Sequence, residues 1–415
     1  MTANHLLCSV NVLAALAFAI AAQLSSATQA ADAVPDLQSL VGATVDVRLT
    51  NGQSWGDAKV EKIRPGSVPG AIRAMTITPH DPPRQQTLGA QSIDEIFLDG
   101  KPLDVSFDKK TRELAHNPEK RQARLQREAA IEERVRSKKG RFWKEISPED
   151  QAKYLAEEKD FLQKLPEKMN LPMQLLETKY FLFYTDMSLK TVGVYVKYLD
   201  AMYEKLTHAF DVPQGKNIWR GKCVVVAFQN PADFHRYERD VMKFTESEGA
   251  QALCHSSSNG RVLIAGYKGN SESFFAVVLV HETAHGFVHR YKTTLHVVPW
   301  INEGIAEWVA QAVVGKLNDE VRRRQGEAVE RIRQTGTLGG TFFADNIRLE
   351  RYQYGAASSI VDVLLRIDPK KYRKLIDNVK EGMDSEEALR DAYGFGHAEL
   401  AQRYGATFGA RNVRP

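Results

Sequence analysis

The chain reads His281-Glu282-Thr283-Ala284-His285, and Glu303 follows eighteen positions later within Trp300-Ile301-Asn302-Glu303-Gly304. On an α-helix, two histidines four residues apart project from the same face, one turn above the other. Two imidazoles so placed can bind one Zn²⁺ at about 2.0–2.1 Å each, while Glu282 can reach a water molecule beside the ion instead of the ion itself. A catalytic zinc takes three protein ligands, so the stretch predicts His281 and His285 as ligands, Glu282 as a general base and a further carboxylate as third ligand.

The residues before this motif are apolar on every side of a helix. They read Phe274-Phe275-Ala276-Val277-Val278-Leu279-Val280, which predicts an interior helix. Burying two imidazoles and a carboxylate there costs free energy unless another group compensates it, and a metal ion would do so. The alternative interpretation is a pair of satisfied core histidines with a surface glutamate.

His289 continues the same helix face but is a poor third ligand. It lies eight residues from His281, a rise of about 12 Å that one ion cannot bridge. A third histidine in the HExxHxxGxxH pattern is also excluded, because Val288 and Tyr291 stand where its glycine and histidine belong. We therefore expect His289 to be a packing residue or a support for the site.

The third ligand is expected on the next helix. Lys292–Val298 reads as a loop, and Asn302 is predicted to cap a helix that runs to about residue 314. Glu303 and Glu307 lie one turn apart on that helix. Glu303 is the expected ligand, and Glu307 is expected to support the site or the fold.

HETAH followed by WINEGIAEW resembles the gluzincin zinc metallopeptidases, over about residues 172–410, and is most similar to the peptidase-MA-like group of secreted bacterial proteins. The resemblance implies a thermolysin-like catalytic domain with Zn²⁺ on His281, His285 and Glu303 and with Glu282 as general base. It also implies that the strand 261–267 is the edge strand that pairs with an extended peptide substrate. The aminopeptidase string G-A-M-E-N is absent from the sequence, so the resemblance implies no aminopeptidase activity.

The family often supplies a tyrosine or histidine that stabilises the developing oxyanion. The resemblance assigns this role to Tyr354, with Tyr352 and His296 as alternatives. A core aromatic at the start of a packed helix is the competing interpretation of Tyr354.

The rest of the chain predicts an α+β protein with further parts. Residues 36–107 are expected to form a small β-barrel that faintly resembles SH3-like or Sm-like barrels. Its predicted strands are Val45–Leu49, Ala58–Ile63, Ala71–Ile77, Ile93–Leu98 and Leu103–Phe107. Residues 108–170 are expected to be a charged helical linker, in which a solvated face is favoured over a basic contact surface, and residues 171–415 the metallopeptidase domain.

The N-terminus indicates export. The first thirty residues contain no Lys, Arg, Asp or Glu, and the apolar stretch Leu13–Ala22 precedes small residues, as in a signal peptide spanning residues 1–30. An uncleaved membrane anchor is the alternative. We therefore expect a secreted or periplasmic protein of the bacterial cell envelope.

Composition limits the partners and the redox chemistry. Cys223 and Cys254 remain beyond the signal segment, and they either form a disulfide or leave Cys223 as a buried thiol. A net charge of +4 is too small to argue for nucleic acid. A peptide or protein is the expected substrate, and the main alternative to a peptidase is a non-enzymatic envelope protein with a structural or vestigial zinc site.

Overall fold

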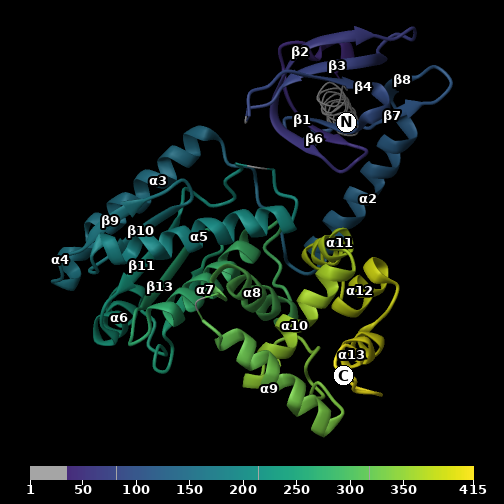
Figure 1. The fold of residues 1–415 in the computed structure, drawn as a ribbon. Coiled ribbons are helices and arrows are strands. Elements are labelled where there is room, and N and C mark those ends of the chain that lie inside the picture. Colours follow the sequence, from purple (N-terminus) through teal and green to yellow (C-terminus); the bar gives the residue numbers. More distant parts are fainter. Residues whose placement is uncertain (1–34, 81, 214, 317) are drawn as a thin grey trace, which may run out of the picture. The chain divides into compact units, whose positions relative to one another are not determined.

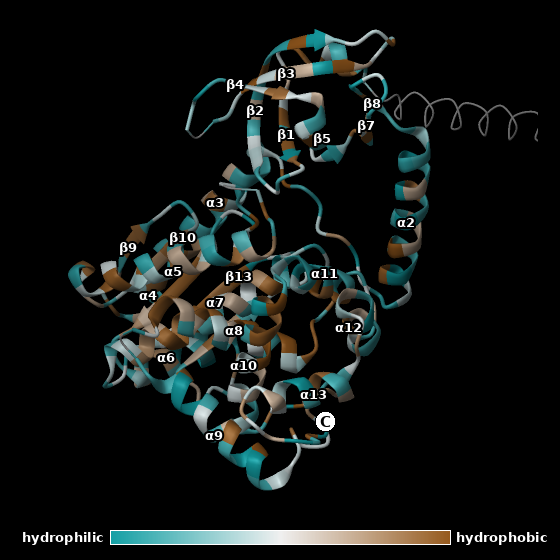
Figure 2. Cartoon of the chain, turned by 45° about the vertical axis from the view of Figure 1, so that its right-hand side comes forward, coloured by the Kyte–Doolittle hydropathy of each residue, from teal (hydrophilic) through white to brown (hydrophobic). Residues whose placement is uncertain are grey.

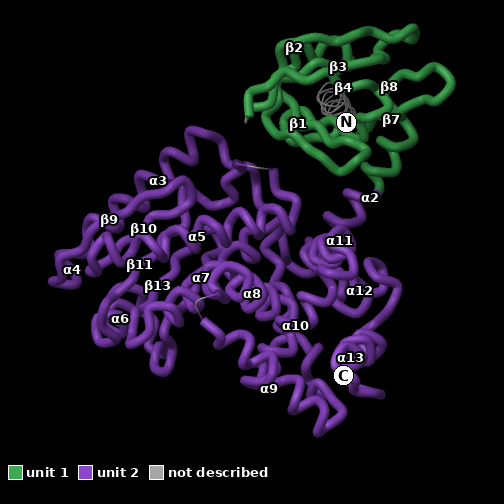
Figure 3. The backbone as a smooth tube through the Cα atoms, in the orientation of Figure 1, with its two compact units in different colours: residues 1–126 green, residues 127–415 purple. Residues whose placement is uncertain are grey.

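The computed structural model describes residues 35–80, 82–213, 215–316 and 318–415 of the chain (Figure 1). The expected α+β class is confirmed. The chain divides into two compact units, Met1–Gln126 and Arg127–Pro415 (Figure 3). The predicted signal peptide lies outside the described residues. Among the helices in the described ranges, none is long and apolar enough to cross a bilayer.

The first unit is built on a curled antiparallel sheet that forms half of a barrel. The strand order is β6-β5-β1-β2-β3-β8-β7, with β4 beside β3. The strands are β1 Thr44–Leu49, β2 Ser54–Pro65, β3 Ile72–Thr78, β4 Gln86–Gly89, β5 Ile93–Leu98, β6 Lys101–Pro102, β7 Val105–Asp108 and β8 Glu113–His116, with short 3₁₀ turns at Leu37–Leu40 and Ala90–Ser92. Inward residues such as Val47, Val60 and Ile96 are fully buried and form this unit's core. The five predicted strands match β1, β2, β3, β5 and β7, whereas β4, β6 and β8 were not predicted.

Helix α2, Pro118–Ser137, carries most of the charged segment, and Val135 is its one buried residue. The helix is therefore solvated over most of its surface, as expected. Helix α3, Pro148–Gln163, starts directly after Ser147, whose side chain accepts a hydrogen bond from the backbone N–H of Asp150.

The second unit contains a five-stranded sheet in the order β12-β13-β11-β10-β9. The central strands β10, β11 and β13 run parallel, and β9 and β12 pair antiparallel at the two edges. The strands are β9 Gln174–Glu177, β10 Phe181–Thr185, β11 Cys223–Phe228, β12 Ala252–Ser256 and β13 Val262–Tyr267. Alternate residues of β10 point to opposite faces: Phe181 and Phe183 pack in one core, and Leu182 and Tyr184 in another.

Helices cover both faces of this sheet. Helices α5, Leu189–Ala209, and α7, Glu272–Arg290, pack on the face of Phe181 and Phe183. Helices α3, α4, Leu165–Met169, and α6, Pro231–Tyr237, pack on the other face, and a π-helical turn, Glu238–Met242, follows α6. Residues 148–169 therefore belong to this unit's core, although they were expected to be part of a linker.

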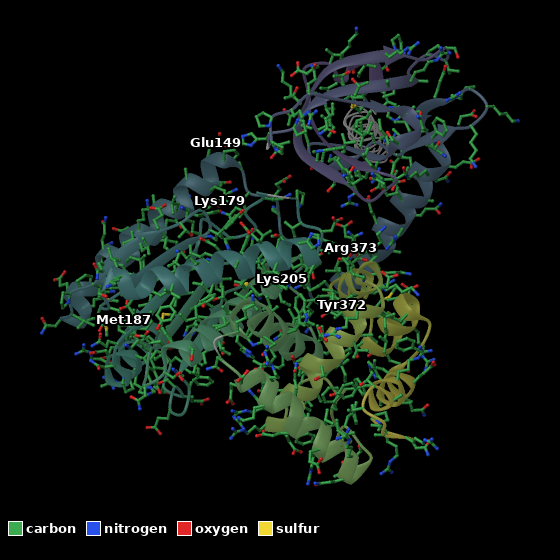
Figure 4. All side chains as sticks on the ribbon, viewed as in Figure 1. Glu149, Lys179, Met187, Lys205, Tyr372 and Arg373 are labelled. Carbon is green, nitrogen blue, oxygen red and sulfur yellow. The ribbon has the colours of Figure 1, made fainter. Side chains whose placement is uncertain are left out.

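Further helices pack beyond α7: α8 Pro299–Val314, α9 Glu320–Thr335, α10 Arg351–Ile367, α11 Pro369–Lys380, α12 Ser385–Tyr393 and α13 His397–Ala406. Figure 2 shows hydrophobic residues concentrated on α7 and α8, and mainly hydrophilic ones on α9. Figure 4 labels Tyr372 and Arg373 on α11. Tyr372 is buried in the core, and Arg373 forms an ion pair with Asp211, which follows α5.

Three expectations need correction. The edge strand is β12, not the strand at 261–267, because β12 pairs along the outer side of β13. Helix α8 starts at Pro299 instead of at Asn302, since proline suits the first turn of a helix and Trp300 and Ile301 are buried in the core. The disulfide alternative is not formed, because Cys223 and Cys254 are free thiols and Cys223 is buried in β11.

Candidate metal centre

The metal motif lies in the second half of α7. This helix is capped at Ser271, whose side chain accepts a hydrogen bond from the backbone N–H of Phe274. Its apolar first half, including Phe275, Val277 and Val280, is buried as the sequence predicted. The helix therefore holds the motif beside β12 and α8, which it contacts extensively.

Three predicted ligand atoms converge. Nε2 of His281 lies 3.1 Å from Nε2 of His285, and Oε2 of Glu303 lies 3.2 Å and 3.4 Å from these two nitrogens. In the described part of the chain, this is the one group of three or more histidine, cysteine or acidic side chains that could hold a metal ion. Glu303 comes from α8, so two helices build the cluster.

The donor set and its spacing fit a tetrahedral zinc site. Ligands about 2.0–2.1 Å from a tetrahedral ion lie about 3.3 Å from one another, close to the three distances in the cluster. Oε2 of Glu303 is buried and makes no hydrogen bond within the described residues, although two imidazole nitrogens lie near it. Two nitrogens and one carboxylate oxygen are also the donors that zinc prefers.

Glu307 supports the cluster from behind. Its Oε1 lies 3.2 Å from Nδ1 of His281, so in the neutral ring the proton would sit on Nδ1 and Nε2 would be free to bind an ion. The same oxygen accepts a hydrogen bond of 2.7 Å from Nη1 of Arg324 on α9. The Glu307 side chain is only 1% exposed, so Arg324 is the counter-charge that makes its burial tolerable.

Two glycines allow the supporting helices to approach closely. A Cβ on Gly304 would lie 2.8 Å from the carbonyl oxygen of Ala357, and a Cβ on Gly355 would overlap the carbonyl group of Arg324. Gly304 follows the ligand Glu303, and Gly355 lies against the helix that carries Arg324. These contacts fix α8, α9 and α10 around the cluster.

Electrostatic interactions within the cluster shift its pKa values. Burial alone would lower the pKa of His281 and His285 and raise that of Glu303. The attraction between the imidazoles and the carboxylates outweighs burial, so the histidine pKa values are raised and that of Glu303 is lowered.

Glu282 has the opposite character. Burial raises its pKa, and the negative charge of Glu303 adds to the rise, while the two imidazoles and the backbone N–H of Cys254 act in the other direction. Cys254 lies on β12, so Glu282 faces the edge strand. A carboxylate with a raised pKa beside a metal cluster is suited to take up and return a proton.

The candidate oxyanion donors have different surroundings. Burial raises the pKa of Tyr354, and the charges of Glu303 and Glu307 add to the rise, while Arg348 acts in the other direction. Tyr352 instead donates a hydrogen bond to the carbonyl oxygen of Leu338, 3.1 Å away. His296 is exposed in the loop after α7. Of the three candidates, Tyr354 is therefore the one that the structure brings into the electrostatic field of the cluster.

His289 lies outside the cluster. Its ring contacts that of Trp143 edge to face, with 5.3 Å between the centroids, and its Nε2 lies 3.3 Å from the carbonyl oxygen of Ser257. It is a packing residue on the far turn of α7.

Sequence reasoning missed two parts of the site. Arg324 lies in the charged segment Glu320–Thr335, where nothing in the sequence distinguishes it from Arg322 and Arg323. The strand β12 has the sequence Ala252-Leu253-Cys254-His255-Ser256, whose polar second half hides the strand pattern. The Asn259-Gly260 turn, directly before the predicted strand 261–267, was the available signal of a hairpin.

No family model matches the chain, and no curated protein matches it. Among solved structures, it is similar to a crystal structure described as that of a functionally unknown conserved protein from Bacillus anthracis str. Ames. The two are 12% identical with a TM-score of 0.33, over 90% of this chain and 69% of that one. A similarity at this level carries no argument about fold or function.

Proposed function

We propose that the protein is an exported zinc-dependent peptidase of the gluzincin type, which hydrolyses peptide bonds. The observation that carries the proposal is the convergence of His281, His285 and Glu303 within hydrogen-bond distance, with Glu282 next to them on the same helix. Neither a structural zinc site nor a pair of core histidines needs such a glutamate.

The chain's residues have distinct roles in this proposal. His281, His285 and Glu303 would hold the ion, and Glu307 with Arg324 would orient His281. When bound, zinc would polarise the substrate carbonyl and lower the pKa of a water molecule to about 7.

Glu282 would move the proton. Its raised pKa lets the carboxylate accept a proton from the attacking water and then return it to the leaving amide nitrogen. Tyr354 would donate a hydrogen bond to the oxygen that becomes negative during attack. Its pKa is raised, so its hydroxyl keeps the proton needed for this bond at neutral pH.

The strand β12 would align the substrate. It lies at the edge of the five-stranded sheet and, within the described residues, pairs with no strand on its outer side. An extended peptide can add there as a further strand, held by backbone hydrogen bonds. The proximity of Cys254 and Glu282 would bring such a peptide past the proposed base.

The finer family assignments are part of the same proposal. The second unit would be a thermolysin-like catalytic domain, and the curled sheet of the first unit a relative of SH3-like or Sm-like barrels. Cleavage of the N-terminal segment would release the protein to the cell envelope or medium.

Glu282→Gln gives the decisive test, because it keeps the size of the side chain but removes the base. Zinc content would be measured by elemental mass spectrometry, and hydrolysis with casein and a fluorogenic peptide library. We expect the variant to bind zinc like the wild type and to hydrolyse peptides at least ~100-fold more slowly. Glu272→Gln, at an exposed position of the same helix, is the matched control and should retain activity.

Two results would contradict the proposal. Undiminished hydrolysis by Glu282→Gln would exclude this mechanism. A zinc-loaded wild-type protein that cleaves no member of the library would favour a binding protein with a structural zinc site.

A further inference from the structure

A second candidate site lies at the C-terminal end of α7, beyond the metal motif. It is a cavity of about 780 Å³, large enough for a small organic ligand. Its walls come from the end of α2, the segment 140–146, α3 and the β12–β13 turn, and all of its lining residues belong to the second unit. None of these residues takes part in the metal cluster.

The cavity is cationic. Its lining includes five basic side chains, of Arg136, Arg141, Lys144, Arg220 and Arg290, and two acidic ones, of Glu132 and Glu133. Two of the basic groups are neutralised by protein carboxylates, since Arg136 pairs with Glu133 and Arg220 lies 2.6 Å from Glu157. For Arg141, Lys144 and Arg290, no carboxylate lies within ion-pair distance in the described part of the chain.

Arg290 is the central group. It is only 6% exposed, and its Nε donates a hydrogen bond of 2.9 Å to the carbonyl oxygen of Ile218. Among the described residues, its two terminal nitrogens have no hydrogen-bond acceptor. Burying most of a guanidinium group without a carboxylate beside it costs free energy. An anion bound in the cavity would reduce that cost.

The surrounding residues make room for this group. Gly260, in the β12–β13 turn, has φ +86°, and a Cβ there would overlap Nη1 of Arg290. Burial and the nearby charge of Arg220 lower the pKa of Arg290 to about 10, which leaves it charged at neutral pH. The cavity therefore contains the positive charge of Arg290, and the glycine at position 260 leaves room for its guanidinium group.

Aromatic rings line the same space. Cζ of Arg290 lies 4.5 Å from the centroid of the Trp143 ring, and Cζ of Arg141 lies 5.9 Å from the same centroid. Trp143 is held in place because its Nε1 donates a hydrogen bond of 2.9 Å to the carbonyl oxygen of His289. Phe142, which is 41% exposed, adds apolar surface. Rings and guanidinium groups arranged in this way suit a ligand with a flat apolar body and a negative group.

We propose that this cavity binds a small organic anion, a carboxylate or phosphate carried on an aromatic or aliphatic body. Arg290 and Arg141 bind the negative group, and Trp143 and Phe142 contact the body. The proposal does not depend on peptidase activity, since it uses no residue of the metal cluster.

Calorimetric titration of the full chain tests the site with benzoate and phenyl phosphate, which distinguish a carboxylate from a phosphate ligand. Benzyl alcohol has the same ring without the charge. We expect at least one of the two anions to bind saturably and benzyl alcohol to bind at least ~10-fold more weakly. Arg290→Met should weaken binding of the anion by about tenfold or more, since it removes a charge-assisted hydrogen bond.

Two further variants control for loss of stability and for a general change of charge. Arg141→Gln changes an exposed side chain, so it should weaken binding even if Arg290→Met proves unstable. Arg366→Met, at an exposed position on α10, should bind like the wild type. The proposal fails if neither anion binds saturably, if benzyl alcohol binds as tightly, or if neither Arg290→Met nor Arg141→Gln weakens binding.

Discussion

Arg324 on α9 and Glu307 on α8 form a buried ion pair, with 2.7 Å between Nη1 and Oε1. The same carboxylate oxygen lies 3.2 Å from Nδ1 of His281. A charge on a third helix therefore fixes the tautomer and orientation of a proposed zinc ligand, through one intervening carboxylate.

Replacing Arg324 should weaken zinc binding without touching a ligand. In Arg324→Gln, Glu307 loses its counter-charge and holds His281 less firmly, so zinc affinity should fall about 10–100-fold. A competition titration with a chromogenic chelator measures this affinity. Arg323→Gln alters the neighbouring, more exposed arginine, which pairs with Glu320, and should leave zinc affinity unchanged. Equal affinities for the two variants would show that the pair does not position His281.

Gly355 is predicted to be essential for the same arrangement. In Gly355→Ala the new methyl group would overlap the carbonyl of Arg324, so α9 and α10 must separate. We expect the free energy of unfolding to fall by about 1–3 kcal/mol, measured by urea denaturation. Gly193→Ala on α5 is the control, because nothing lies within 4 Å of its added methyl group. It should be neutral or stabilising by up to about 1 kcal/mol.

The parts of the fold predicted from the sequence are those with strong local signals. Strand β1 contains the alternating run Val45-Asp46-Val47-Arg48-Leu49, and α7 contains a long apolar run followed by the motif. The start of α3 is also defined locally, by the capping side chain of Ser147 and the first-turn proline Pro148. In each case, residues close together in the sequence determine the secondary structure, so the element can be predicted without knowing its tertiary contacts.

The missed parts depend on contacts between distant residues. Strand β8 pairs with β3 through Leu114 and Ile72, which are far apart in the sequence, and β6 has only two residues. Arg324 meets Glu307 only because α8, α9 and α10 pack together. Glu303 and Glu307 could be predicted to join the site because both lie a short distance after the motif, whereas Arg324, which pairs with Glu307 from a third helix, could not.

Lys380 joins α11 to the end of α7. Its Nζ is buried and donates hydrogen bonds of 3.0 Å and 2.9 Å to the carbonyl oxygens of Val288 and Leu295. Lys380→Met would leave both oxygens without this donor, so we expect unit 2 to lose about 2–3 kcal/mol of stability in urea denaturation. Lys371→Met, at an exposed position on the same helix, should change stability by less than about 0.5 kcal/mol. A similar loss in both variants would show that the contacts of Lys380 are not responsible.

His289 should make the second unit sensitive to acid. Burial lowers its pKa from the ordinary 6.5 to about 4. Between these two pH values the unfolded chain binds a proton that the folded chain excludes, so the stability that His289 contributes is complete above pH 6.5 and is lost as the pH falls towards 4. Because the ring is partly exposed, we expect about 1–2 kcal/mol of this loss between pH 7 and pH 5.

Urea denaturation of the wild type and of His289→Phe at these two pH values isolates this effect. Phenylalanine keeps a ring against Trp143 but cannot be protonated, so the variant should lose less stability on acidification than the wild type. His208→Phe, at an exposed position of α5, should retain the wild-type pH dependence. If wild type and His289→Phe lose the same stability between pH 7 and pH 5, His289 is not the group that excludes the proton, and the acid sensitivity of this unit must arise elsewhere.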